Sequence, residues 1–231
     1  MKQRPDEGGF IQDVIHGGLT GTITTFAVVS GITGASLGAN IILIIGSANL
    51  LAHGFTIAIS NYLGIEAKNK YTNKERKQVT KDILSHLNAS EEELEKFYRK
   101  HHYTKDEANK LVHTLVKHKQ TFADTIMDEE LHIENHQESP LKTSLVTFFS
   151  FLFFGFVPLF SYVLDLFSAM FIANPFVVAT SLTGATIFGL GTFKAALTDK
   201  HWFASGLQIL ILGGAAALIA FYVGSTLSHF A

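Results

Sequence analysis

The chain lacks several features that mark common classes of protein. It contains no cysteine, which excludes disulfide bonds and thiolate metal sites. It has no Gly-rich phosphate loop, dinucleotide-binding turn, nucleophile elbow or zinc-protease helix. Its apolar stretches hold no nucleophile and no paired acid and base, and no basic arm for nucleic acid is present. We therefore predict that the protein is not an enzyme and does not bind nucleic acid.

Charge is missing from the centres of five long apolar stretches. The 18 Lys and Arg residues all lie elsewhere: Lys2 and Arg4, fourteen residues from Lys68 to Lys142, and Lys194 and Lys200. A bilayer core about 30 Å thick is crossed by about 20 apolar residues in a helix. We predict an all-α integral membrane protein with five transmembrane helices, at about residues 17–37, 40–63, 145–164, 171–197 and 206–227.

The cationic segments predict the orientation in the membrane. Loops rich in Lys and Arg stay on the cytoplasmic side, and five spans place all three cationic segments on that side. We therefore expect a cytoplasmic N-terminus and a cytoplasmic helical insert between spans two and three. The predicted domains are 1–64 (tail and spans one and two), 65–139 (insert) and 140–231 (spans three to five).

The membrane that holds the protein is predicted from weaker signals. The first residues show no compact apolar segment followed by a small-residue cleavage site, so we expect the first span to direct insertion. The composition is rich in Lys and Asn. Together these features favour a bacterial plasma membrane.

Gly and Pro residues predict local features of the spans. Spans one and two are rich in small residues, and Gly34 and Gly38 have the spacing of a GxxxG helix-packing pair. Pro158 is expected to bend the Phe-rich third span. Pro175 lies near the start of span four, where its missing N–H is harmless.

The insert contains neither Gly nor Pro between Glu66 and Ser139, which favours helices. Ser90–Glu93 and Thr104–Glu107 have the spacing of capping boxes. We predict helices at about 65–87, 91–101, 105–119 and 121–137. Their inner face is predicted to contain Leu111, Leu115, Val116, Phe122, Ile126 and Met127.

The last predicted helix of the insert carries candidate metal ligands. Glu130, Glu134 and Glu138 recur every four residues, as do His132 and His136. Carboxylate and imidazole ligands suit Fe²⁺, Mn²⁺ and Zn²⁺, and the Met127 thioether would add a soft ligand. The alternative interpretation is a solvated acidic face, which is common on surface helices.

His53 is the second candidate, because it lies deep in span two. An ionisable group at that depth indicates a functional site, although a neutral His bonded to a neighbouring helix is the alternative. Asn49 and Asn61 lie on roughly the same face. Threonines of span one, including Thr20, offer hydroxyl oxygens, but Thr in membrane helices often bonds the carbonyl four residues earlier. No Asp or Glu lies in a predicted span, so His53 and His16 are the titratable candidates.

Long segments of the chain resemble the vacuolar iron transporter family. The resemblance rests on GTITTFAVVSGITGA in span one, GSANLLAHGFTIAISNYLG in span two, MDEELHI in the insert, and the sequences of spans three to five from SPLKTSLVTFF to IAFYVG. It implies a homodimer that exports Fe²⁺ or Mn²⁺ from the cytosol by proton antiport. It further implies a metal path between subunits, lined by spans one and two, and a metal-binding insert.

The family's motifs also assign roles to individual residues. Met127 matches the second Met and Glu130 the Glu of a Met-Met-x-x-x-Glu motif, while Ile126 replaces the first Met. The implied ligands of the insert are Met127, Glu129, Glu130, Glu66, Glu75 and Asp82. In the path, Thr20 and His53 stand where the family has Asp, Ile57 stands where it has Met, and Asn61 stands where many members have Glu. The path residues are thus Thr20, Asn49, His53, Ile57 and Asn61, with His53 also a candidate ligand.

Two functions follow from these patterns. The first is a transporter of Fe²⁺ or Mn²⁺ that binds no permanent cofactor and whose partners are metal ions, lipid and a second copy of the chain. The alternative is a membrane-bound metal sensor or structural relative that does not transport. It is motivated by the replaced Asp and Met residues of the path.

Overall fold

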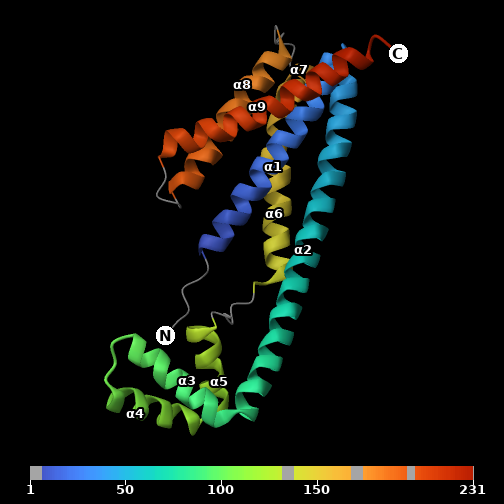
Figure 1. Ribbon diagram of the computed structural model, residues 1–231. Helices are drawn as coiled ribbons and strands as arrows, with labels where there is room; N and C mark the ends of the chain where they lie inside the picture. The colour runs from blue at the N-terminus through green and yellow to red at the C-terminus, as the bar shows by residue number, and fades with distance from the viewer. Residues whose placement is uncertain (1–6, 132–137, 168–173, 197–200, 231) are drawn as a thin grey trace. The chain divides into compact units, whose positions relative to one another are not determined.

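The computed structural model describes residues 7–131, 138–167, 174–196 and 201–230 (Figure 1). Every regular element in these residues is a helix. The chain divides into two compact units, which we treat separately. The membrane unit comprises Met1–Tyr62 and Pro140–Ala231, and the insert unit comprises Leu63–Ser139.

Long apolar helices make up the membrane unit. In the described part of the chain, four helices are long and apolar enough to cross a bilayer: α1 (Glu7–Gly34), α2 (Ala39–Ser85), α8 (Pro175–Ala196) and α9 (Trp202–Leu227). The shorter helices α6 (Pro140–Gly155) and α7 (Val157–Phe167) form a bent pair that counts as a fifth span. The prediction of an all-α fold is therefore confirmed, with four spans or five if the bent pair is one.

Proline positions explain two of the helix boundaries. The axis changes direction by 46° between α6 and α7, next to Pro158, as predicted. Proline removes a backbone N–H and clashes with the preceding turn, so the helix breaks there. Pro175 is the first residue of α8, and the Asn174 side chain accepts a hydrogen bond from the N–H of Val177 (3.3 Å). Asn174 therefore caps α8.

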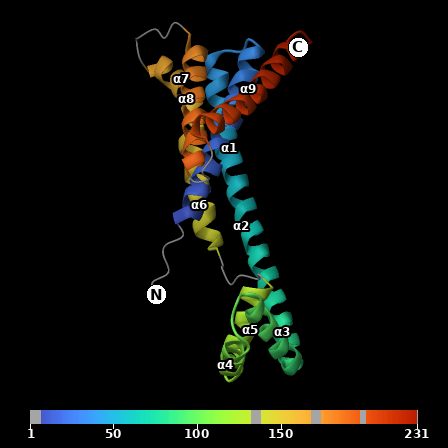
Figure 2. The ribbon, with the colours of Figure 1, turned by 60° about the vertical axis from the view of Figure 1, so that its left-hand side comes forward.

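Glycines allow α1 to approach its neighbours closely. α9 runs across α1 and α8 (Figures 1 and 2). A Cβ at Gly224 would collide with the carbonyl oxygen of Gly31, and one at Gly34 with that of Phe221. The predicted GxxxG pair is wrong, because Gly34 is the last residue of α1 and Gly38 lies beyond the turn. Gly34 instead packs against a helix distant in the sequence.

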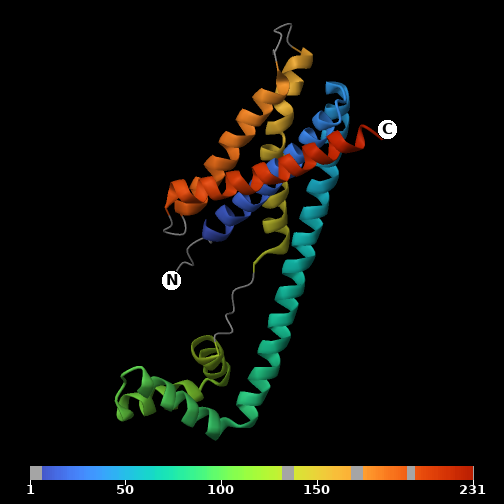
Figure 3. The ribbon, with the colours of Figure 1, turned by 45° about the horizontal axis from the view of Figure 1, so that its top comes forward.

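The insert unit is a small bundle around an apolar core. Besides its part of α2 it contains α3 (Leu87–Lys100), α4 (Lys105–Val116), α5 (Lys119–Thr125) and the π-helix η1 (Ile126–Glu130). α3 and α4 pack as a hairpin (Figure 3). The buried core consists of Ile83, Leu94, Val112, Phe122, Ala123, Ile126 and Met127. The predicted inner face is confirmed for all its members except Leu111, since Leu115 and Val116 pack against this core. Leu111 is exposed, and the neighbouring Val112 is buried instead.

One of the two predicted capping boxes forms. The Thr104 hydroxyl accepts from the N–H of Glu107, and the Glu107 carboxylate accepts from the N–H of Thr104. The prediction of a capping box at Ser90 is wrong, because α3 already begins at Leu87. Ser90 lies inside its first turns and donates to the carbonyls of Ile83 and His86.

The other predicted helices of the insert differ at their ends. α2 ends at Ser85, and α4 ends at Val116. The last predicted helix, 121–137, begins earlier, at Lys119, and changes from α to π geometry at Ile126. Its continuation over 132–137 lies outside the described residues.

Candidate metal sites

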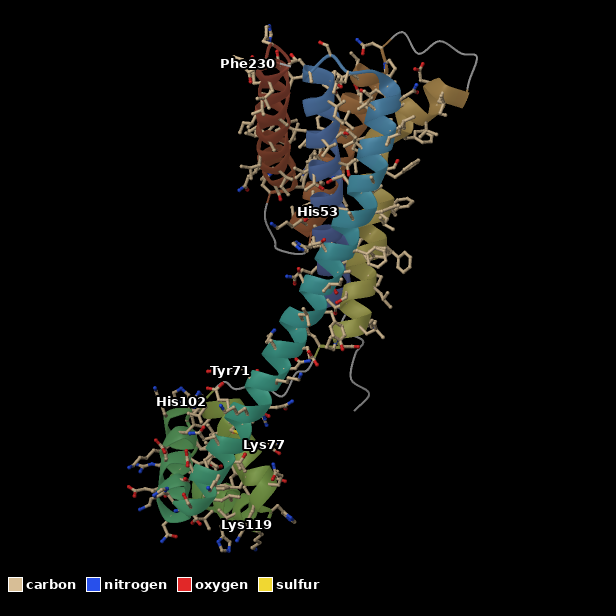
Figure 4. The ribbon with its side chains drawn as sticks, turned by 90° about the vertical axis from the view of Figure 1, so that its right-hand side faces the viewer. His53, Tyr71, Lys77, His102, Lys119 and Phe230 are labelled. Carbon is tan, nitrogen blue, oxygen red and sulfur yellow. The ribbon has the colours of Figure 1, made fainter. Side chains whose placement is uncertain are left out.

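A stripe of candidate path residues follows one side of α2. Asn49, His53, Ile57 and Asn61 are spaced by four residues, which keeps them near one helix face. His53 is exposed in the single chain, and its ring stacks on Phe151 with centroids 5.7 Å apart (Figure 4). Within the described residues no hydrogen bond to a neighbouring helix holds this imidazole. Its ring nitrogens thus remain available to a ligand.

The other members of the stripe are partly engaged. The Asn61 amide donates to the Thr147 hydroxyl (3.0 Å), which itself donates to the Thr143 carbonyl. Ile57 packs on the apolar core of the membrane unit, and Asn49 is half-buried. Asn61 is therefore oriented by α6, and Ile57 behaves as a packing residue.

The hydroxyls of Thr20, Thr22 and Thr24 on α1 bond carbonyls of their own helix. Thr20 donates to the His16 carbonyl (2.8 Å), and Thr24 donates to that of Thr20 (2.7 Å). This is the pattern that Thr is expected to show in a membrane helix. Within the described residues no hydrogen bond links Thr20 to the α2 stripe.

Two carboxylates lie near the ends of the candidate spans. Asp13 belongs to α1, ahead of the predicted first span at 17–37, and is half-buried. Asp165 belongs to α7, just beyond the predicted third span at 145–164. That no Asp or Glu lies inside the predicted spans stays a prediction.

In the insert unit, Met127 lies in the apolar core. Its side chain is fully buried, and its sulfur lies 3.7 Å from the Thr80 hydroxyl, whose single proton is shared between this sulfur and the Arg76 carbonyl oxygen (2.7 Å). Glu129 accepts a hydrogen bond from the Tyr98 hydroxyl. Burial, followed by the charge and hydrogen bond of Glu129, raises the pKa of Tyr98 to about 12. Both candidate ligands thus have partners within the insert.

An arginine that the sequence analysis did not single out organises this helix. Arg76 of α2 donates to Asp124 (2.8 Å) and to Asp128 (2.7 Å). Burial lowers the pKa of Arg76, but its hydrogen bonds with and attraction to Asp128 and Asp124 outweigh burial, so the pKa lies above its ordinary value. The sequence feature that could have pointed to a shared cationic partner is the four-residue spacing of Asp124 and Asp128.

The remaining candidate ligands are dispersed. Glu66 pairs with Lys70 on the same helix (2.8 Å). Glu75 and Asp82 line a groove of about 300 Å³ on α2, together with Tyr71, Lys74, Gln78 and Val79. Glu130 ends the π-helix and its side chain lies outside the described part, as do His132, Glu134 and His136.

The metal-site geometry of a single chain follows from these contacts. Among the described residues, no group of three or more His, Asp or Glu side chains is arranged to hold a metal ion. The sequence-predicted ligands of the insert therefore stay a prediction. The structure brings Met127 and Glu129 onto the same short helix but directs both to protein partners.

Comparison with known proteins identifies the family. A sequence model described as the VIT family matches residues 11–225. The vacuolar iron transporter of Plasmodium berghei (strain Anka) is 31% identical over 220 residues, which are 93% of this chain and 81% of that protein. The Plasmodium falciparum (isolate 3D7) protein of that name is 29% identical, over 95% of this chain and 82% of its own. Vacuolar iron transporter 1 of Arabidopsis thaliana is 23% identical, over 96% and 88%. The chain therefore belongs to the VIT family, a family of multi-pass membrane iron transporters and not of enzymes, as its motifs predicted.

Proposed function

We propose that the protein carries a divalent transition metal, Fe²⁺ or Mn²⁺, out of the cytosol in exchange for protons. The observation that carries this proposal is the family match over residues 11–225, on a chain with apolar helices for up to five spans. Its relatives are called vacuolar iron transporters. Export from the cytosol is what the family resemblance implies, and the cationic segments favour a cytoplasmic N-terminus and insert.

In this proposal, two copies of the chain form the metal path along α1 and α2. The exposure of His53 in the single chain supports it, as does the exposure of large apolar residues of α2 such as Phe55 and Ile59. Oxygen ligands would come from Thr20, Asn49 and Asn61. A second copy would cover the stripe and bring two His53 rings to one path.

His53 would couple metal movement to protons. Imidazole binds a metal only when neutral, so metal and proton compete for the same ring nitrogen. On the acidic side of the membrane, protonation of His53 would release the metal. On the other side, loss of the proton would restore the ligand.

Metal flux in proteoliposomes tests this role of His53. We expect uptake of Mn²⁺ or Fe²⁺ that grows with an opposing pH gradient and is lost in His53→Ala. His229→Ala is the matched control, because His229 is exposed near the C-terminus and lies outside the path. Unchanged flux in His53→Ala would remove His53 from the path.

A sensor that does not transport is the second candidate. Thr20 replaces an Asp of the family motif, and its hydroxyl bonds its own helix. Ile57 replaces a Met of the motif and packs on the apolar core. Neither residue supplies the ligand that it replaces. If the wild type binds metal without flux, restoring the family residues in Thr20→Asp/Ile57→Met should create transport. A double variant without flux would count against the idea that the replaced Asp and Met residues explain the absence of transport.

Cell fractionation tests which membrane holds the protein. The relatives are named for a vacuole, whereas the composition of this chain favours a bacterial plasma membrane. We propose the plasma membrane. Recovery of the protein in another membrane fraction would contradict this assignment.

A further inference from the structure

Arg76 occupies an unusual position in the insert unit. Its side chain is only 9% exposed, and its two terminal nitrogens bond separate carboxylates, Asp124 and Asp128. These two residues lie one turn apart on the last helix of the insert, and each is itself half-covered. One guanidinium thus bonds two carboxylates of the same segment.

The other described ligand groups of this segment also have donors. Met127 accepts from Thr80, and Glu129 accepts from Tyr98. Glu138 accepts from Lys68 (3.0 Å). The donors come from α2 and α3, so the polar groups of the segment hold the insert together from within.

A metal ion would have to compete with these contacts. The guanidinium stays protonated at any physiological pH, so it does not leave by losing a proton. Displacing it from Asp124 and Asp128 would leave a largely buried charge without those carboxylates, which is strongly unfavourable. The metal would also have to draw Met127 out of a core in which it is fully buried.

We propose that Arg76 takes the place of a divalent cation in the insert unit. It neutralises Asp124 and Asp128 and keeps the Met127 turn closed, so that this part of the chain is folded with no metal bound to these three residues. The cargo metal therefore reaches the membrane path without being held by them. This inference concerns the insert alone and stands whether or not the membrane unit transports.

Counting bound Mn²⁺ on the full-length protein tests the proposal. The electron paramagnetic resonance signal of unbound aqueous Mn²⁺ gives the number and affinity of sites in detergent. We expect Arg76→Gln to bind about one more Mn²⁺ per chain than the wild type, because the two carboxylates are released. Adding Asp124→Asn and Asp128→Asn to that variant should abolish the gain.

Two matched controls separate this effect from a change in net charge. Arg99→Gln removes the same charge from an exposed position on α3 and should leave Mn²⁺ binding at the wild-type level. Arg76→Lys keeps the charge and should bind at least about tenfold more weakly than Arg76→Gln at the new site. An Arg76→Gln protein with no additional Mn²⁺ would overturn the proposal.

Hydrogen exchange on the wild type provides a test without substitution. Saturating Mn²⁺ should leave the exchange of residues 124–128 unchanged, and slower exchange that is centred there would show metal binding and overturn the proposal. If Arg76→Gln is unfolded in chelator, added Mn²⁺ should restore the fold of the insert. Failure of Mn²⁺ to do so counts against a cation-replacing role. Flux is measured separately, so these outcomes do not depend on transport.

Discussion

The membrane unit and the insert unit satisfy their polar groups in different ways. In the membrane unit, hydroxyls such as Thr20, Thr22 and Thr24 bond carbonyls of their own helix, and glycines let backbones touch. In the insert, long-range charged contacts such as Arg76 with Asp124 and Asp128 join helices far apart in the sequence.

The difference reflects the two solvents. Lipid supplies no hydrogen bonds and no hydrophobic drive between helices, so local bonds and close packing stabilise the membrane unit. The insert is a small domain with a small core, and small cores stabilise weakly. In the insert, the contacts of Arg76 with Asp124 and Asp128 add specific links between helices to this small core.

The largest expected effect comes from the core of the insert. Met127→Ala should destabilise the insert by about 3 kcal/mol, because a fully buried side chain is replaced by a cavity. Hydrogen exchange of the insert peptides measures this loss. Met127→Leu, which conserves volume, should cost less than about 1.5 kcal/mol and leave metal flux unchanged. Loss of flux in a stable Met127→Leu protein would make Met127 a ligand instead.

A smaller effect is expected from close packing in the membrane unit. Gly224→Ala should destabilise the unit by about 2 kcal/mol, because the new Cβ meets the backbone of Gly31 on α1 and of Ala35, the residue after α1. Thermal unfolding in detergent measures it. Gly214→Ala lies on the same helix and meets nothing within 4 Å, so it should be neutral. Equal melting temperatures for the two variants would show that α1 and α9 do not touch as described.

Tyr98 predicts a loss of stability in alkali. Its pKa is raised from 10.0 to about 12 by burial and by Glu129, so its contribution is complete below pH 10 and is lost as pH rises through 12. We expect the free energy of unfolding to fall by about 1 kcal/mol over this pH range. This is less than the full pKa shift implies, because the ring is partly exposed. Denaturant unfolding of wild type and Tyr98→Phe at several pH values measures it. The same alkaline slope in both proteins would exclude Tyr98 as the cause.

The smallest expected effect is at the start of α4. Thr104→Ala removes the capping box and should cost about 0.5–1 kcal/mol in the insert. Ser90→Ala is the comparison, since Ser90 has the same sequence motif but does not cap α3. Hydrogen exchange in the first turn of α4 should rise only in Thr104→Ala. Faster hydrogen exchange at the start of α3 in Ser90→Ala would instead support the predicted capping box at Ser90.

Local signals predicted the features that depend on a few neighbouring residues. Pro158 bends the third span, and the Thr104 cap depends only on residues up to Glu107. The spacing of Ser90 and Glu93 looks the same, but its use depends on where α2 ends. Gly34 and Gly38 likewise required knowledge of where α1 ends.

Long-range features escaped the sequence analysis for a physical reason. Arg76 meets carboxylates 48 and 52 residues later, and only the folded insert brings them together. Met127 fitted both a core position and a ligand position, since a thioether is apolar and also a soft donor. Its burial and its contact with Thr80 indicate the core position.

Metal uptake and internal pH, recorded together in sealed proteoliposomes, test the central claim most directly. The account predicts that the wild type moves Mn²⁺ or Fe²⁺ across the membrane and that protons move the opposite way in step with the metal. Folded protein that gives no uptake above protein-free liposomes for either metal, in either direction of the pH gradient, would contradict it.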